Sequence, residues 1–290
     1  MVLFHFLSKC MQLCRQRRTV LAAGLMALAF TLAGCGGIGF NPQVTAIKAQ
    51  SAQYSRTAII LIGGRDLRSN FVVDTQGGCT GPAFASSSTT ETLVLTCRVV
   101  KVGDIPVTVS TADGALLYKG SITVPKPQVV ITTNGGAFTL ELDPSAAPIT
   151  VDNFLGYVNS GYYKGTLFHR VIPGFVAQAG GYTSGVVKKE GQNAPITLES
   201  NNGLSNLRGT VAMARTSVPN SATSEFYVNL VDNTFLDYRS AASPGYAVFG
   251  KVVQGLDAID TIATQPTGIV NGFSDVPLTD VTISLALQVQ

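Results

Sequence analysis

The chain has 290 residues, of which 46% are hydrophobic and only 13% charged, with a net charge of +3. This length is ample for two ordinary domains. Three arginines near the N-terminus, Arg15, Arg17 and Arg18, account for the excess of positive charge, and no run of like charges follows later in the chain. Without a basic surface to neutralise phosphates, the composition argues against a nucleic-acid partner.

The N-terminus has the pattern of a targeting segment. The basic cluster precedes an apolar run over residues 20–32, which is shorter than the roughly 20 residues that span a bilayer comfortably. The run ends in Leu32-Ala33-Gly34-Cys35, which resembles the lipobox of bacterial lipoproteins.

In that family the signal is cut before the cysteine, which then carries lipid. The resemblance implies that residues 1–34 are a signal peptide, that Cys35 is lipidated, and that residues 35–41 form a tether. Gly36 in place of an aspartate favours a periplasmic protein on the outer rather than the inner membrane. An ordinary secretory signal with an incidental cysteine is the alternative.

The five cysteines divide according to this scheme. Cys10 and Cys14 lie in the segment to be removed, and Cys35 carries lipid. Cys79 and Cys97 are left as an even pair in an oxidising compartment. We predict a disulfide between them; two buried free thiols are the alternative.

Residues 42–126 alternate short apolar runs with turn residues, which predicts a small β-sandwich. The segment looks immunoglobulin-like but lacks the tryptophan of true immunoglobulin domains, since the chain contains none. Its role stays open between a spacer, a partner-binding module and a dimerisation element. The expected strands cover residues 57–62, 92–97, 105–109 and 121–124.

Pro125-Lys126-Pro127 reads as a short, stiff connector, so a second domain is expected over residues 127–290. It begins with strands at residues 129–132 and 138–142, joined by a tight turn at Asn134-Gly135-Gly136.

Two helices are expected among the many strands of this second domain. Pro148 introduces the first, whose apolar residues at i, i+3, i+4 and i+7 form one face, and Gly161 ends it. The second covers residues 256–263. Two helices among so many strands suit a closed barrel capped at its ends. The apolar face of the first helix consists of Val151, Phe154, Leu155 and Val158.

One arginine, Arg170, lies between an apolar strand and the Pro173-Gly174 turn, with Phe168 and Phe175 on either side. A charge in such a place needs a partner or a role. Holding a polar backbone group of a bound peptide beside an apolar pocket fits this position.

The stretch from Phe168 to Gly181 resembles the signature segment of cyclophilins, the peptidyl-prolyl cis-trans isomerases. Further blocks follow the family's order at residues 147–154, 209–214, 221–227 and 246–252. The resemblance covers roughly Gln128 to the C-terminus. It implies a mainly β protein, in which the Ig-like sandwich is followed along the chain by an eight-stranded antiparallel barrel capped by two helices.

Isomerisation of an X-Pro bond breaks no bond, so it needs no nucleophile, metal or cofactor. The barrier of about 18–20 kcal/mol comes from amide resonance, and a preorganised donor that favours the twisted amide lowers it. His169 is the only histidine beyond the expected signal peptide, which excludes a histidine-rich metal site.

The resemblance assigns the site residue by residue. It makes Arg170 the catalytic arginine, and Gln178 the residue that bonds the substrate backbone and helps to hold the arginine. Phe175, Val176, Tyr227 and Leu236 match the proline pocket, and Ala214 and Arg215 match the strand that binds extended peptide. The remaining expected substrate-binding residues are His169, Glu225, Phe235 and Tyr246.

Four of these positions depart from the usual pattern. Val176 replaces methionine, which leaves a roomier pocket, and Tyr227 replaces phenylalanine, which adds a hydroxyl that needs a partner or water. Glu225 replaces glutamine, and its carboxylate is expected to pair with Arg170 or Arg215. Phe235 replaces the tryptophan of cyclosporin-sensitive members, so cyclosporin should bind weakly.

The leading hypothesis is therefore a membrane-tethered prolyl isomerase that acts on unfolded or extended proline-containing polypeptides in the periplasm. The alternative is a peptide-binding chaperone or interaction module with little catalysis, which Glu225 and the additional N-terminal domain motivate.

Overall fold

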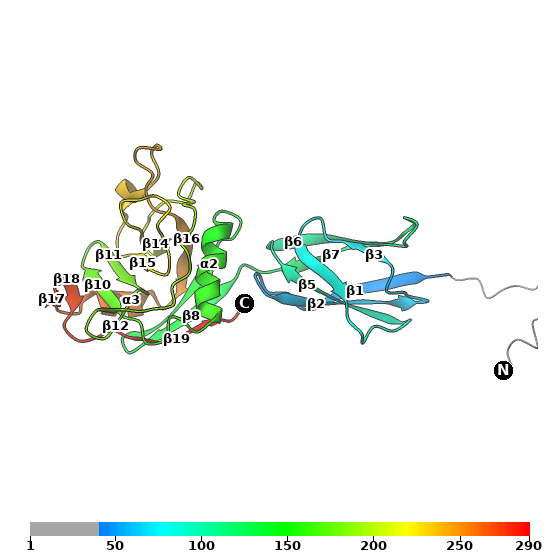
Figure 1. The fold of residues 1–290 in the computed structure, drawn as a ribbon, viewed down its shortest axis with the longest axis horizontal. Helices are drawn as coiled ribbons and strands as arrows, with labels where there is room; N and C mark the ends of the chain where they lie inside the picture. Colours follow the sequence, from blue (N-terminus) through cyan, green and yellow to red (C-terminus); the bar gives the residue numbers. More distant parts are fainter. Residues whose placement is uncertain (1–40) are drawn as a thin grey trace, which may run out of the picture. The chain divides into compact units, whose positions relative to one another are not determined.

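Residues 43–124 form two antiparallel sheets in the structure, a computed structural model that describes residues 41–290 (Figure 1). The predicted signal peptide, Cys35 and nearly all of the tether lie outside the described residues. One sheet has the order β1-β2-β5-β4 and the other the order β3-β6-β7. The strands are β1 Gln43–Ser51, β2 Thr57–Arg65, β3 Val72–Asp74, β4 Cys79–Phe84, β5 Thr92–Val99, β6 Gly103–Ser110 and β7 Leu116–Val124.

The two sheets pack over a shared apolar core because their strands alternate with period two. Ile60 on β2 and Leu95 on β5 are buried in the same cluster as Val107 on β6 and Ile122 on β7. The strands therefore form a two-layer sandwich, as the alternation predicts.

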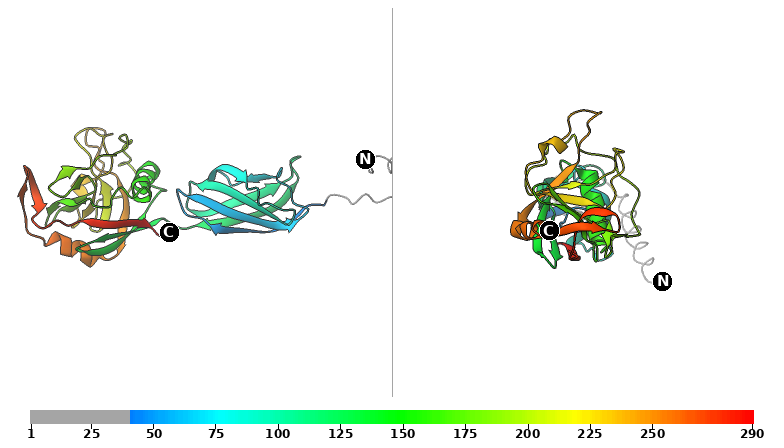
Figure 2. Two further views of the ribbon diagram at one scale, coloured as in Figure 1. Left: turned by 60° about the horizontal axis from the view of Figure 1, so that its bottom comes forward. Right: turned by 90° about the vertical axis from the view of Figure 1, so that its left-hand side faces the viewer.

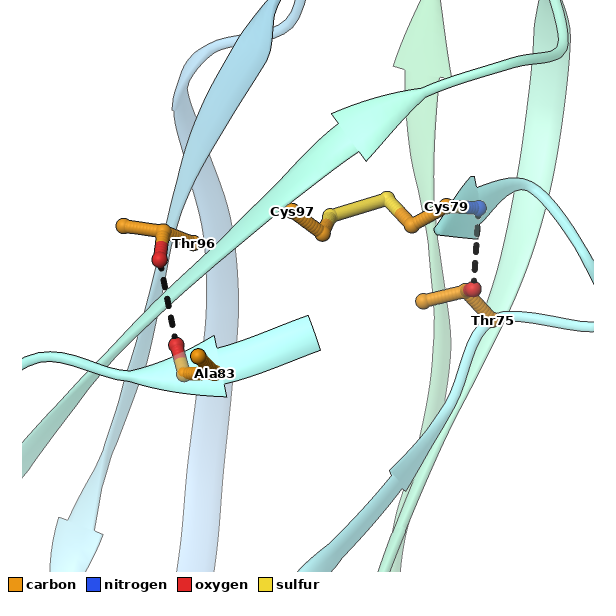
Figure 3. Close-up of a disulfide and its surroundings, with 5 residues drawn as sticks. All are labelled: Thr75, Cys79, Ala83, Thr96 and Cys97. Atoms are coloured by element: carbon orange, nitrogen blue, oxygen red, sulfur yellow. Dashed lines mark hydrogen bonds between the residues drawn. A yellow bond between two sulfur atoms is a disulfide. The ribbon is translucent and has the colours of Figure 1, made fainter. Parts of the chain in front are cut away.

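Cys79 and Cys97 lie on the neighbouring strands β4 and β5, and a disulfide joins them (Figure 3). Their Cα atoms are 5.6 Å apart, and both residues belong to the core between the two sheets. The backbone N–H of Cys79 donates to Oγ1 of Thr75 at 3.1 Å. The bond therefore holds the start of β4 against β5.

An eight-stranded antiparallel sheet makes up most of residues 128–288, in the order β10-β11-β15-β14-β16-β9-β8-β19. Its last strand, β19, is the red strand near the C-terminus in Figure 2 and pairs with β8. The strands are β8 Gln128–Thr133, β9 Gly136–Leu142, β10 Phe168–Ile172, β11 Val176–Ala179, β14 Thr210–Met213, β15 Phe226–Asn229, β16 Val248–Gln254 and β19 Ile283–Gln288.

The sheet curls so that its two outer strands meet. The backbone N–H of Phe168 donates to the carbonyl of Val281 at 2.9 Å, and that of Ile283 donates to the carbonyl of Thr166 at 2.8 Å. These bonds connect the β10 side to the β19 side, which confirms the predicted barrel.

Two helices accompany the barrel, α2 Pro148–Asn159 and α3 Leu256–Ala263. Both match their predicted ranges, and the predicted apolar face of α2 is buried. Gly161, just beyond α2, has a φ of 72°, a conformation that glycine adopts without steric cost. None of the helices within residues 41–290 is long and apolar enough to cross a membrane.

Three smaller elements of residues 128–288 lie outside the eight-stranded sheet. The 3₁₀ helix η1 covers Thr234–Leu236. Strands β12 Tyr182–Thr183 and β13 Val187–Lys188 form one hairpin, and β17 Thr267–Val270 and β18 Phe273–Pro277 form another.

Aromatic side chains fill the inside of the barrel. Phe154 on α2 lies 5.4 Å from Phe226 and 5.1 Å from Phe249, measured between ring centroids. Tyr163 packs on Phe226 at 5.4 Å and donates its hydroxyl to the carbonyl of Ser224 at 2.8 Å. With its interior filled in this way, the barrel has no room for a substrate inside, so a binding site must lie on its outer surface.

The disulfide leads to a direct test. Replacing Cys79 and Cys97 together by alanine should lower the free energy of unfolding by about 3 kcal/mol, because the bond closes a loop of 18 residues in the unfolded chain. Denaturant titrations of oxidised and reduced protein measure this difference, and the double variant should show no response to reductant. Reactive thiols at Cys79 and Cys97 in the denatured, unreduced protein would contradict the pairing.

Candidate active site

A β-bulge in β10 turns Arg170 toward the outside of the barrel. The register of β10 and β11 shifts between Phe168, which lies opposite Ala179, and Arg170, which lies opposite Gln178. Phe168 and Val171 both point into the core, although strict alternation would place residues three apart on opposite faces. The extra residue, His169, resolves this conflict, as bulges beside active sites commonly do.

Arg170 begins a row of side chains that runs across the outer face of the barrel. Gln178 lies opposite Arg170, and Tyr227 lies opposite Gln178. The row continues through Ala212 on β14 to Val248 on β16. Five strands therefore contribute one residue each to the same line, although these residues are scattered over much of the sequence.

This row borders a small pocket of about 150 Å³. Phe175, in the turn between β10 and β11, and Leu236 in η1 wall the pocket, and the floor is an apolar cluster that includes Val176 and Tyr227. All of its lining residues are predicted site residues: Arg170, Phe175, Val176, Gln178, Ala214, Arg215, Tyr227, Leu236 and Tyr246.

The guanidinium of Arg170 stands at the edge of this pocket. Its Cζ lies 5.9 Å from the centroid of the Phe175 ring, and its Nε lies 4.0 Å from Oδ2 of Asp275. The side chain is 39% exposed, so the charge keeps contact with water. A cation placed in this way can donate hydrogen bonds to a polar group bound beside the apolar pocket.

Glu225 does not pair with either arginine, which corrects the expectation from the sequence. Among the ion pairs of residues 41–290, its Oε2 instead meets Nε2 of His169 at 3.2 Å. The same oxygen accepts a hydrogen bond from Nε2 of Gln178 at 2.8 Å. The bulge explains this choice, because it places an extra residue, His169, beside Arg170 in β10. The His169 side chain is buried, only 5% exposed, whereas that of Arg170 is 39% exposed.

These contacts fix the proton positions around Glu225. An ionised carboxylate only accepts, so Nε2 of His169 carries the proton. Burial on its own would raise the pKa of Glu225, but the hydrogen bond and charge of His169 and the bond from Gln178 outweigh it, so the pKa lies below its ordinary value. Because the Gln178 amide nitrogen is engaged, its amide oxygen is the atom left to face Arg170 or a substrate.

Gly181 makes room for this arrangement. A Cβ built on Gly181 would come within 2.7 Å of Oε1 and Cδ of Glu225, closer than real side-chain atoms approach. Glu225 also lines a second cavity of about 340 Å³, which shares Gln178, Ala214 and Arg215 with the first pocket. The carboxylate therefore belongs to the second cavity and does not line the first pocket.

The added hydroxyl of Tyr227 has a protein partner. It donates to Oδ1 of Asn206 at 2.8 Å, and Nδ2 of Asn206 donates to Oδ1 of Asp237 at 2.9 Å. Burial, together with the nearby hydroxyl of Tyr246 and carboxylate of Asp237, raises the pKa of Tyr227. Through Asn206, the neutral Tyr227 phenol in the pocket floor is therefore connected to Asp237, which follows Leu236 of the pocket wall.

The remaining predicted residues lie at the rim. Phe235 is 59% exposed and stacks on Phe175 with ring centroids 5.8 Å apart. The Cζ of Arg215 lies 4.5 Å above the ring of Tyr246, and both Nε and Nη2 of Arg215 donate to the carbonyl of Gly245. Arg215 is therefore held by the segment at Gly245 and Tyr246 rather than by Glu225.

Three contributors were not predicted from the sequence: Asp275, Asn206 and Gly181. Gly181 belongs to the signature segment, but its contact with Glu225 depends on strand pairing. Asn206 and Asp275 lie in segments without a distinctive pattern, so only the fold brings them to the site.

The family model for cyclophilin type peptidyl-prolyl cis-trans isomerases matches residues 128–286. Peptidyl-prolyl cis-trans isomerase A of Dickeya dadantii is 49% identical over 158 residues, which are 54% of this chain and 82% of that protein. Peptidyl-prolyl cis-trans isomerase B of Escherichia coli is 46% identical over 157 residues, 53% of this chain and 95% of that protein.

Among solved structures, a cyclophilin type isomerase of Cryptosporidium parvum, determined in the presence of the dipeptide Ala-Pro, is 29% identical, with a TM-score of 0.49. The alignment covers 56% of this chain and 99% of that one.

The environment of Glu225 predicts a pH-dependent contribution to stability. A folded-state pKa below the ordinary value of 4.5 means that Glu225 stabilises the fold above pH 4.5 and loses this contribution as the pH falls through its folded pKa. The stability of the wild type relative to Glu225→Gln should therefore decline between about pH 5 and about pH 3. Urea titrations across this range measure the decline.

Glu190→Gln is a matched control, since Glu190 is exposed on the neighbouring loop. Its stability relative to the wild type should change less over the same range. A Glu225→Gln difference that is flat or that grows on acidification would show that His169 and Gln178 do not stabilise the carboxylate.

Proposed function

Because the chain belongs to the cyclophilin-type peptidyl-prolyl cis-trans isomerase family, it is a prolyl isomerase, and we propose that it serves unfolded or extended proline-containing polypeptides outside the cytoplasm. The observation that supports this most strongly is Arg170 at the edge of an apolar pocket. Uncatalysed isomerisation takes tens to hundreds of seconds, slow enough to limit the folding of secreted proteins.

In this proposal the proline ring enters the pocket between Phe175, Tyr227 and Leu236. The substrate backbone then lies along the outer face of the barrel, within reach of Gln178 and of the segment around Ala214. Arg170 donates to the prolyl carbonyl or to the amide nitrogen as it becomes pyramidal. This interaction is stronger in the twisted state than in either planar isomer, so it lowers the barrier.

We assign the protein to the periplasmic side of a membrane, anchored by lipid on Cys35, with the outer membrane favoured over the inner. The Leu32-Ala33-Gly34-Cys35 sequence supports the anchor, and Gly36 supports the outer membrane. The Cys79–Cys97 pairing supports an oxidising compartment.

We further propose that residues 42–126 are an Ig-like domain joined at Pro125–Pro127 to an isomerase domain over residues 127–290. The sheet orders β1-β2-β5-β4 and β3-β6-β7 match those of a seven-stranded immunoglobulin sandwich. The Cys79–Cys97 bond lies within one sheet, whereas the immunoglobulin disulfide joins the two sheets.

A peptide-binding module with little catalysis is the second candidate. It is favoured by the carboxylate of Glu225, which engages the amide nitrogen of Gln178 at 2.8 Å and so takes up a donor that could otherwise bind substrate. Binding of a proline peptide without turnover would identify this function.

Arg170→Ala separates the two candidates. It should reduce kcat/KM for a blocked X-Pro peptide roughly a hundredfold or more, because it removes the donor aimed at the twisted amide. Exchange spectroscopy by NMR measures the rate without a coupled protease. Its control is Arg239→Ala, which removes an exposed arginine outside the pocket and should keep the wild-type rate. Unchanged turnover in folded Arg170→Ala would refute the mechanism.

The membrane anchor has its own test. Bacteria that express the full chain should incorporate labelled palmitate into the wild type and not into Cys35→Ser, and the variant should leave the membrane fraction. A Gly36→Asp variant should shift the labelled protein toward the inner membrane. Equal labelling of the wild type and Cys35→Ser would rule out lipidation at this cysteine.

A further inference from the structure

The β17–β18 hairpin places a carboxylate beside the catalytic arginine. β18 packs against β10 (Figure 1), and Oδ2 of Asp275 on β18 lies 4.0 Å from Nε of Arg170. Both side chains are 39% exposed. Asp275 lies outside the short sequence blocks that first indicated the family, although within the range that the family model matches.

The backbone of the hairpin directs Asp275 to this position. Thr267 pairs with Pro277 and Gly268 with Val276, but Val270 pairs with Phe273, so Ser274 and Asp275 share one partner position on β17. Asp275 has a φ of 61°, in the left-handed region that aspartate tolerates better than most residues. This irregularity turns its carboxylate out of the β17–β18 ladder.

The hairpin is anchored on the same substructure that holds Glu225. Phe273 packs edge-on against Tyr182 with ring centroids 5.2 Å apart, and Tyr182 packs against His169 at 4.6 Å. Nδ2 of Asn271 donates to the carbonyl of Gly185 at 2.6 Å, and Val276 is buried. Asp275 is thereby fixed between anchored neighbours.

We propose that Asp275 is a positioning residue for the isomerase reaction, which restricts the Arg170 guanidinium to the edge of the proline pocket. Because β10 is an edge strand with β11 on one side and β18 packed against it, Asp275 and Gln178 approach Arg170 from different sides. The Phe175 ring lies 5.9 Å from Cζ of Arg170. An exposed ion pair of this kind adds little to stability. Its effect is to reduce the orientations that a long, flexible side chain samples before substrate arrives. This inference rests on the proposed role of Arg170.

The test uses Asp275→Asn in the full chain, because asparagine keeps the shape and also tolerates a positive φ. For an uncharged, blocked X-Pro peptide, kcat should fall about two- to fivefold while KM stays unchanged, as expected for a group that acts through the transition state. In 1 M salt, where the Debye length is about 3 Å, the wild-type rate should approach that of the variant.

A double-mutant cycle distinguishes a role through Arg170 from a general structural role. In an Arg170→Ala background, Asp275→Asn should change the residual rate by less than experimental error, because the group it positions is gone. Asp280→Asn is the matched control; Asp280 follows β18 and takes part in none of the ion pairs within residues 41–290. It should keep the wild-type kcat.

An unchanged or raised kcat in Asp275→Asn would overturn this inference, as would an equal loss in the Arg170→Ala background. The two proposals fail separately. If Arg170→Ala abolishes turnover and Asp275→Asn does not lower it, only the positioning role is wrong. If Arg170→Ala keeps full turnover, the proposed mechanism is wrong whatever Asp275→Asn does.

Discussion

The register of three strands, β10, β11 and β15, is the constraint on which the site depends. Because side chains alternate between the two faces of a strand, a slip of one residue would exchange the outer face for the core. Arg170 would then point into an interior filled by aromatic rings, where an unpaired charge costs several kcal/mol. The bulge at His169 lets Phe168 and Val171 share the core while Arg170 faces the pocket. The same packing that stabilises the barrel therefore sets the orientation of the arginine.

Two polar groups near the pocket distinguish this chain, the Tyr227 hydroxyl and the Glu225 carboxylate. Each has a protein partner, as low-dielectric surroundings require, whereas Nδ1 of the neighbouring His169 is buried without one. The Tyr227 hydroxyl meets Asn206, and the Glu225 carboxylate meets His169 and Gln178. The unusual residues at these positions thus come with their own hydrogen-bond networks, which keep the pocket walls in place.

Much of the fold and the location of the site could be predicted from the sequence, because local patterns determine them. Apolar residues at every second position predicted the strands, and apolar residues with a period of 3.6 predicted α2. The segment from Phe168 to Gly181 predicted the location of the pocket. The partner of Glu225 could not be predicted, since its choice between His169 and an arginine depends on a bulge that alternation alone does not reveal. Asp275 and Asn206 could not be predicted either, because they reach the site through the closure of the sheet and the packing of loops.

A structure of the protein with a bound X-Pro peptide would test the central claim, that Arg170 acts on the prolyl amide beside the apolar pocket. We predict that the proline ring lies between Phe175, Tyr227 and Leu236, with a guanidinium nitrogen about 2.7–3.2 Å from the prolyl carbonyl oxygen or amide nitrogen. A proline ring bound elsewhere, or an arginine that stays out of hydrogen-bond reach of the prolyl amide when the peptide is bound, would contradict it.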